Sequence, residues 1–252
     1  MFEIRMEAGD TPGLPADFAE AIEWARRRGV VLPDEFYAAL EEHARGGSFT
    51  VSGLAGLDQI QAALDSLNQA LESGETFEQW QARVGPLLGG LPDGRTETIF
   101  RNFMQQAYNA GRWKQFEQNK TALPYLMFSA VMDDRTTTVC RARNGIIRPV
   151  DDAFWATNSP QLHHRCRSVL IALSPAQANA RSRNGNGLAK PEPPDRPEPG
   201  WGYRPSGEEV AAGLAAAIAA AAKNAPVGWL AAIIAFFTSG WRLLVEWLGR
   251  WF

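Results

Sequence analysis

The sequence has little of several features that define particular classes of protein. Its 252 residues include only two cysteines, which excludes a scaffold held by several disulfides and a zinc module with four cysteine ligands. Basic residues (25) nearly balance acidic ones (28), so the net charge of -3 excludes a protein that simply coats nucleic acid. The apolar stretch at residues 228–240 is shorter than the ~20 residues that a membrane-spanning helix needs. With 45% hydrophobic and 21% charged residues, the chain has an ordinary globular composition.

Charge and tryptophan are unevenly distributed along the chain. The net charge is -7 over residues 1–120, +5 over residues 121–190 and -1 over residues 191–252. A basic middle section indicates one face suited to an acidic partner. Four of the nine tryptophans lie in the last 24 residues, so the C-terminal segment differs in kind from the rest.

Residues 1–120 predict helices joined by turns. Apolar residues recur at helical spacing in three segments, residues 17–28, 34–44 and 57–71. Thr76 and Gln79 have the spacing of a capping box, which predicts a short helix after Thr76. Thr96 is expected to cap the next helix, which runs to about Gln118.

Residues 121–180 predict a small unit that mixes strands and helices. Residues 125–131 and 136–140 are rich in strand formers, and residues 168–173 could add a third strand. The dipeptide Asn144-Gly145 is typical of a type I′ hairpin turn, because both residues tolerate positive φ. The expected fold class is therefore α+β and predominantly α, with a small domain that contains a β-hairpin.

Two further segments are expected to follow the small domain. Residues 181–205 predict a linker, since six prolines between 191 and 205 favour an extended backbone. Residues 206–252 predict a hydrophobic and partly amphipathic helical arm. Its aromatic and aliphatic residues are candidates for docking: Trp229, Trp241, Leu244, Val245, Leu248, Trp251 and Phe252. Docking into a protein groove is favoured over membrane contact, because the polar stripe carries only two arginines and one glutamate.

Chemically active residue types concentrate between residues 133 and 167, and a helix upstream carries further motifs. The motifs are Arg-x-Glu-Thr at 95–98, Ala-Tyr-x-Ala-Gly-Arg at 107–112, Asp-x-Arg-Thr at 133–136, Cys140, a turn at Gly145, Asp-Asp at 151–152 and Pro-x-x-His-x-x-Cys-Arg at 160–167. In their order and spacing, over about residues 20–175, they resemble the Mu F-like minor head protein family of tailed phages, also called the phage head morphogenesis domain.

The resemblance implies a structural protein of the virion head that is made in few copies and assembled in the host cytoplasm. Members of this family associate with the portal vertex or capsid interior and assist head assembly, DNA packaging or DNA delivery. The implied partners are portal or capsid proteins, and the resemblance does not imply an enzyme. The alternatives from other classes are a metal-dependent nuclease or other DNA-processing enzyme, and a membrane-active ejection protein acting through the C-terminal arm.

The two cysteines and a neighbouring histidine form a candidate metal site. Cys140, His163 and Cys166 are suitable ligands for a structural zinc ion, with Asp133 or His164 as a fourth. The same residues are also compatible with a buried cysteine pair, a disulfide, or a pair of nucleophile and base. No cofactor is firmly expected beyond this candidate zinc.

The remaining charged residues of the middle section have two interpretations each. The aspartates at 133, 134, 151 and 152 are candidate magnesium ligands, or residues that close turns and pair with arginine. The arginines are candidates for local contact with packaged DNA or an acidic protein partner, or for ion pairs within the chain. They are Arg135, Arg141, Arg143, Arg148, Arg165 and Arg167.

Overall fold

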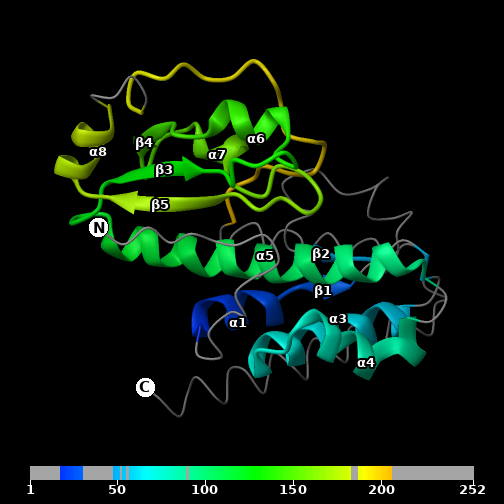
Figure 1. Cartoon of the computed structure of the whole chain (residues 1–252). Coiled ribbons are helices and arrows are strands. Elements are labelled where there is room, and N and C mark those ends of the chain that lie inside the picture. Colours follow the sequence, from blue (N-terminus) through cyan, green and yellow to red (C-terminus); the bar gives the residue numbers. More distant parts are fainter. Residues whose placement is uncertain are drawn as a thin grey trace, which may run out of the picture.

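The computed structural model describes residues 18–30, 48–51, 53–54, 57–88, 91–182 and 187–205. The long helix α5 (Asp93–Asn119) lies between a layer of helices and a small domain with a three-stranded sheet (Figure 1). The predicted class, α+β and predominantly α, is confirmed. The helix predicted over residues 34–44 and the whole C-terminal arm, with its seven docking candidates, lie outside the described residues.

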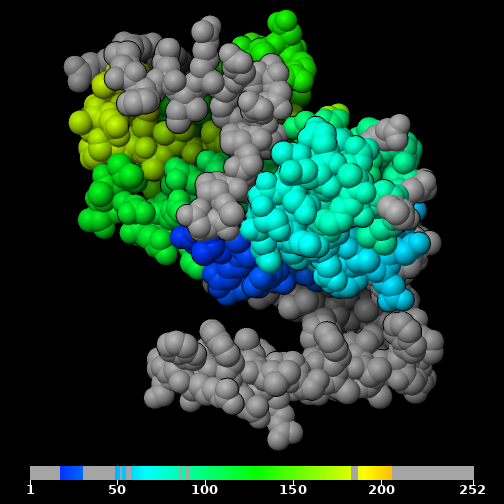
Figure 2. Space-filling view, turned by 60° about the horizontal axis from the view of Figure 1, so that its bottom comes forward, coloured from blue at the N-terminus to red at the C-terminus, as the bar shows by residue number. Residues whose placement is uncertain are grey.

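The helical layer consists of α1 (Ala19–Arg26), α3 (Leu57–Ser73) and α4 (Phe77–Leu88), which lie against one side of α5. Figure 2 shows α1 in blue beside the surface formed by the cyan α3. A short parallel pair of strands, β1 (Gly29–Val30) and β2 (Ser48–Phe49), adjoins these helices. Among the described residues, no helix combines the length and hydrophobicity that crossing a membrane requires.

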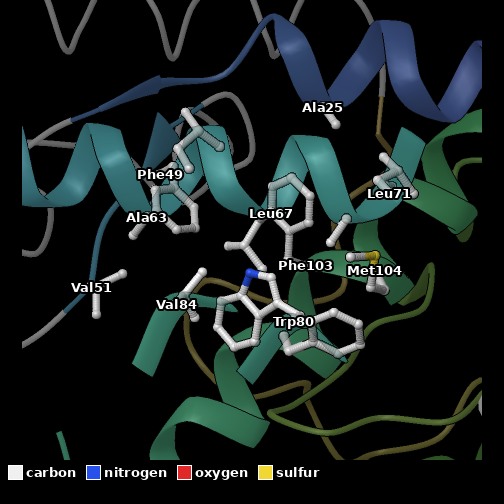
Figure 3. Packing of buried hydrophobic residues seen from close by; sticks show 14 of the residues in the cluster. Ala25, Phe49, Val51, Ala63, Leu67, Leu71, Trp80, Val84, Phe103 and Met104 are labelled. Carbon is white, nitrogen blue, oxygen red and sulfur yellow. The ribbon is translucent and has the colours of Figure 1, made fainter. Parts of the chain in front are cut away.

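Trp80 lies at the centre of the helical layer and is fully buried (Figure 3). Its indole N–H donates to the Ser66 hydroxyl at 3.2 Å, and its ring lies 5.2 Å from that of Phe100 on α5. Leu67 of α3 and Phe103 of α5 are buried in the same cluster. The apolar positions that predicted α3 from their spacing are thus the positions that face this core.

The ends of two helices test the capping predictions. The Thr76 hydroxyl accepts the N–H of Gln79, and the Gln79 side chain accepts the N–H of Thr76, so the predicted capping box is confirmed. The prediction that Thr96 caps α5 is wrong. The helix begins at Asp93, directly after Pro92, and Thr96 is buried within it.

The sheet of the small domain has the strand order β4-β3-β5, and all its pairings are antiparallel. The predicted strands near residues 125 and 170 are confirmed. Met127 of β3 pairs with Ile147 on one side and Ile171 on the other. The strands are β3 (Tyr125–Ser129), β4 (Ile147–Pro149) and β5 (Val169–Leu173), and the short helices are α6 (Thr138–Arg143), α7 (Trp155–Asn158) and α8 (Pro175–Ser182).

The prediction of a tight hairpin turning at Asn144-Gly145 is wrong, because the strand predicted over residues 136–140 runs into helix α6. The Thr137 hydroxyl accepts the N–H of Cys140 and so caps α6, and this local bond outweighs the strand preference of a β-branched run. Gly145 directly follows Asn144, the C-cap residue of α6. Its positive φ of 80° ends the helix and directs the chain into β4.

Residues 187–205, called the strap below, form no helix and no strand, as predicted for a linker, but they are bonded to the small domain. The N–H of Glu198 donates to the Leu162 carbonyl at 3.0 Å, and the N–H of Gly202 donates to the Gln161 carbonyl at 2.7 Å. Buried Arg143 donates to the Asp195 carbonyl at 2.6 Å. The strap is therefore part of the folded body, since its backbone groups find their partners there.

Candidate functional site

Cys140 is positioned by the turn that precedes α6. The Asp133 carboxylate accepts the N–H of Arg135 at 3.1 Å and the hydroxyl of Thr136 at 3.0 Å, which closes the turn. The Thr137 cap then starts the helix, and Cys140 is buried on its inner side. Local side-chain bonds therefore determine where this thiol lies.

A loop between α7 and β5 brings His163 and Cys166 to the same place. Arg165 in this loop has a positive φ of 58°, and its N–H donates to the Asn102 side chain on α5 at 2.7 Å. The N–H of Cys166 bonds to the His163 carbonyl at 3.3 Å, so the loop closes on itself. The anchor on α5 holds the loop against the body.

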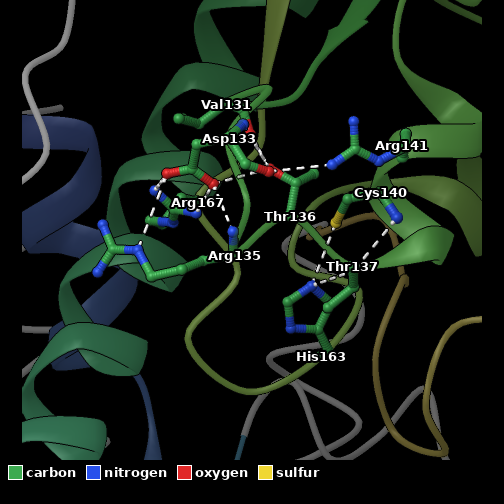
Figure 4. Close-up of polar contacts among 9 residues, drawn as sticks. All are labelled: Val131, Asp133, Arg135, Thr136, Thr137, Cys140, Arg141, His163 and Arg167. Carbon is green, nitrogen blue, oxygen red and sulfur yellow. Dashed lines mark hydrogen bonds and ion pairs between the residues drawn. The ribbon is translucent and has the colours of Figure 1, made fainter.

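Cys140, His163 and Cys166 form a cluster whose ligand atoms all lie within 4.8 Å of one another. The Cys140 Sγ is 3.2 Å from the His163 Nε2 and 3.6 Å from the Cys166 Sγ. Both cysteines are free thiols and buried, and His163 is half-buried. The sequence prediction named these three residues together, and the structure brings them together. Figure 4 shows the contact between Cys140 and His163.

The contacts within the cluster separate the protonation of its two thiols. Hydrogen bonds from Cys166 and His163 hold the pKa of the Cys140 thiol well below its ordinary value. The same contact with Cys140, together with burial, raises the pKa of Cys166. The bond to Cys140 also raises the pKa of His163, although burial opposes it. Cys140 is therefore the thiolate of the pair, and a thiolate is the form that binds metals and acts as a nucleophile.

Asp133, the predicted fourth metal ligand, is bonded elsewhere. Arg167 donates to each of its carboxylate oxygens at 2.7 Å. This bidentate pair is shown in Figure 4, with Thr136 on the same carboxylate. His164, the other candidate, bonds to Asn102 at 2.8 Å and lies edge-on to Trp201. Neither residue is among the three clustered ligands.

The candidate arginines mostly have partners within the chain. Arg143 is buried and bonds to Asn158 at 2.7 Å. Arg165 pairs with Glu97 at 2.5 Å. Arg148 donates to strap carbonyls, including that of Leu188 at 3.1 Å. Arg141 donates to the backbone carbonyl of Asp133, and Arg167 donates to the Asp133 carboxylate. Arg135 lies 3.8 Å from the same carboxylate, and 68% of the Arg135 side chain is exposed.

The other predicted acidic residues also have different surroundings. Asp151 pairs with Lys120 at 3.2 Å and is exposed, while Asp152 accepts the N–H of Phe154 at 2.8 Å and so closes a turn. Sequence reasoning missed Thr137 and Ser168, which line a small cavity beside Cys140. The β-branched run concealed the capping role of Thr137, and local spacing did not place Ser168 beside Cys140.

Comparison with known proteins agrees with the motifs. Residues 61–171 match the family described as Phage Mu protein F like protein. The putative capsid assembly protein F of Escherichia phage Mu is 28% identical, over 63% of this chain and 40% of its own length. The Mu-like prophage FluMu F protein of Haemophilus influenzae is 28% identical, over 58% of this chain and 39% of its own. The chain thus spans about 40% of these relatives.

No solved structure matches the chain significantly. The family match begins in α3, continues through α5 and ends in β5, so it includes the clustered cysteines and histidine as well as Asp133 and Arg167. The resemblance inferred from the motifs is confirmed: residues 61–171 match the Phage Mu protein F-like family, and both relatives carry the name of protein F.

Proposed function

We propose that this chain is a structural protein of a tailed-phage head and takes part in head assembly. The observation that carries the proposal is the family match over residues 61–171, together with relatives named for capsid assembly. Its place would be the virion head after assembly in the host cytoplasm. Its work would be that of an adaptor near the portal, with portal or capsid proteins as partners, and not that of an enzyme.

The internal bonding of the charged residues supports a structural role. Asp133 is neutralised by Arg167, and Arg165 is paired with Glu97 of α5. The first pair joins two segments of the small domain that are far apart in the sequence, and the second braces that domain against α5. A body braced in this way suits a protein that fixes the relative position of its partners.

Contact with packaged DNA or an acidic protein surface is a finer part of the proposal. Of the candidate arginines that form an ion pair, Arg135 has the most exposed side chain. Its nitrogen lies 3.8 Å from the nearest oxygen of the Asp133 carboxylate. Its guanidinium is therefore the least committed to the body and the best placed to meet a phosphate or carboxylate. An Arg135→Ala variant should weaken such contact, whereas Arg148→Ala should act through the strap.

Incorporation into heads tests the proposal. The full chain is produced together with the portal, scaffold and major capsid proteins of a tailed phage, and purified heads are analysed for its presence. We expect the chain in heads, and we expect deletion of residues 206–252 to abolish incorporation if the arm docks into a protein. Absence of the full chain from heads would contradict the proposal.

The same assay separates the alternatives. Normal incorporation of the truncated chain with failed genome delivery would indicate membrane action by the arm. A double variant, Asp133→Asn with Asp151→Asn, should still enter heads. A DNA-cleaving activity in the full chain that this double variant lacks would indicate a nuclease instead.

A further inference from the structure

We propose that Cys140, His163 and Cys166 bind one zinc ion, which joins helix α6 to the loop before β5. The proposal is independent of the role in head assembly, since it depends only on the geometry of the cluster. Two sulfur atoms and an imidazole nitrogen from separate segments converge within 4.8 Å. Thiolate sulfur and imidazole nitrogen are the donors that zinc prefers in structural sites.

The distances between the donor atoms suit a tetrahedral ion. With Zn–S bonds of about 2.3 Å and Zn–N bonds of about 2.0 Å, two sulfurs lie about 3.8 Å apart and a sulfur and nitrogen about 3.5 Å apart. The observed separations are 3.6 Å between the Cys140 and Cys166 sulfurs and 3.2 Å between the Cys140 sulfur and the His163 Nε2. The third pair, the Cys166 sulfur and the His163 nitrogen, lies within 4.8 Å, so these two atoms would approach by up to about 1.3 Å to admit the ion.

The ring of His163 is oriented as a metal ligand. Its Nδ1 lies 2.8 Å from the carbonyl oxygen of His164, and a carbonyl can only accept, so Nδ1 carries the proton. With the ion bound, the neutral ring would give up the hydrogen bond between Nε2 and the Cys140 sulfur and turn the Nε2 lone pair to the zinc. A backbone acceptor on the far ring nitrogen is the arrangement that fixes metal-binding histidines.

The fourth coordination position lies on the side of a small cavity. Cys140 and His163 line this cavity with Thr136, Thr137 and Ser168. Cys166, by contrast, is buried behind them. A water molecule held by the neighbouring hydroxyls would complete the tetrahedron, as in other zinc sites with three protein ligands.

Two other uses of the thiols fit the arrangement less well. A disulfide between Cys140 and Cys166 would leave the oriented His163 without a role. A nucleophile acting on a substrate would need room for that substrate beside its sulfur, but Cys140 is buried and the cavity that it lines is small. Zinc accounts for all three side chains and for the orientation of the ring.

Metal content provides the first test. The full chain, without a polyhistidine tag, is purified in the presence of a reductant, and its zinc is measured by elemental analysis. We expect about one zinc per chain, and almost none in Cys140→Ser, Cys166→Ser or His163→Ala. The matched control is His164→Ala, the neighbouring histidine of the same loop, which should keep its zinc. Absence of zinc from the unmodified chain after addition of zinc sulfate would overturn the proposal.

Measurements on the unmodified chain guard against variants that fail to fold. The zinc-free chain, prepared with a chelator, is titrated with Co²⁺, whose visible spectrum reports tetrahedral geometry and whose near-ultraviolet band reports thiolate ligands. We expect both signals to saturate at one equivalent and to disappear when Zn²⁺ is added. An octahedral spectrum without the thiolate band would overturn the site.

Counting thiols separates zinc from a disulfide. In the zinc-bound chain the two cysteines should react slowly with a thiol reagent, and both should react quickly after chelation. If the chain purified from the reducing cytosol instead shows no reactive thiol after denaturation, and its mass is two hydrogens lower, the cysteines form a disulfide and the proposal is wrong.

Discussion

Arg167 donates two hydrogen bonds to Asp133, one to each carboxylate oxygen, and both are 2.7 Å long. Arg167 directly follows Cys166, and Asp133 closes the turn that leads to Cys140. The ion pair therefore joins the same two segments as the cysteine cluster, through a second and chemically independent link. Because the geometry is bidentate, the pair holds the segments in one orientation.

Acid should remove the contribution of this pair to stability. Hydrogen bonds from Arg167 hold the pKa of Asp133 well below its ordinary value. The stabilisation is therefore complete above the unfolded-state pKa, near about 4, and is lost as the pH falls below that value. We expect Asp133→Asn to lower the melting temperature at pH 7 and to differ less from the unmodified chain at pH 3.

The matched control for this prediction is Asp151→Asn, which makes the same chemical change in an exposed pair with Lys120. Its effect on the free energy of unfolding should stay within about 0.5 kcal/mol, as for other exposed sites. If the two variants lower the free energy of unfolding equally in urea at pH 7, the contact with Arg167 contributes no more to stability than an exposed ion pair does.

Gly111 on α5 should tolerate no side chain, because α1 lies directly on it. A Cβ at this position would lie 2.8 Å from the backbone nitrogen of Ala21 and 2.7 Å from the ring of Phe18. We expect Gly111→Ala to destabilise the fold by about 1–3 kcal/mol, despite the better helix propensity of alanine. Chemical unfolding with tryptophan fluorescence measures the difference.

Gly94, on the first turn of the same helix, supplies the control. Beyond the helix's own backbone and the two chain neighbours, no atom of the described residues lies within 4 Å of the Cβ that alanine would add. Gly94→Ala should therefore leave the free energy of unfolding unchanged or raise it by up to about 1 kcal/mol. If Gly111→Ala is as well tolerated as Gly94→Ala, the close contact between α1 and α5 is wrong.

Arg143 should be the most sensitive of the six candidate arginines. It is buried, and it donates to Asn158 at 2.7 Å, to the Val139 carbonyl at 3.0 Å and to the Asp195 carbonyl at 2.6 Å. Arg143→Met leaves these acceptors without their donor, which should cost about 2–4 kcal/mol. Amide exchange around Asp195 should also accelerate, because the strap loses an anchor.

Arg141→Met makes the same change two residues earlier on α6, where the side chain is exposed. We expect its cost to remain below about 1 kcal/mol and the exchange of the strap to stay unchanged. Similar protection of the strap in both variants would contradict the anchoring role of Arg143.

Two helices begin with the same reciprocal cap, which allows a paired test. Thr76 and Gln79 exchange bonds at the start of α4, and Ser174 and Gln177 do so at the start of α8, with the backbone N–H of Gln177 donating to the Ser174 hydroxyl at 3.3 Å. Thr76→Ala and Ser174→Ala should each cost about 1 kcal/mol, whereas Thr76→Ser should cost little. Equilibrium unfolding in urea measures all three, and an equal loss in Thr76→Ser and Thr76→Ala would argue against the hydroxyl bond.

The parts of the fold that the sequence predicts well are those with local causes. The spacing of leucines along α3 and the reciprocal bonds of Thr76 and Gln79 are both contained within a few residues. The predicted cluster of Cys140 with His163 and Cys166 also formed. The His-x-x-Cys part of it is local, and the residue types of all three side chains indicated the contact with Cys140.

The misplaced parts depend on contacts that local preference does not contain. Residues 136–140 have strand-forming side chains, but the cap at Thr137 makes them enter a helix. Asp133 and Arg167 were assigned to different roles because 34 residues separate them in sequence. The strap has the composition of a linker, and its bonds to the small domain, such as those of Glu198 and Gly202, show that it is fixed.

The course of the strap determines how the protein would respond to tension. The strap ends on α5, where the Arg204 guanidinium lies 4.7 Å from the centre of the Trp113 ring and pairs with Glu117. A pull on the chain after residue 205 would load this contact first, and the bonds of Gly202 and Glu198 only after it had broken. Contacts in series yield one at a time, so the strap would peel from its end. Helix α5 has side chains in the hydrophobic cluster of the helical layer and in that of the small domain. It would therefore transmit the force to both parts of the body.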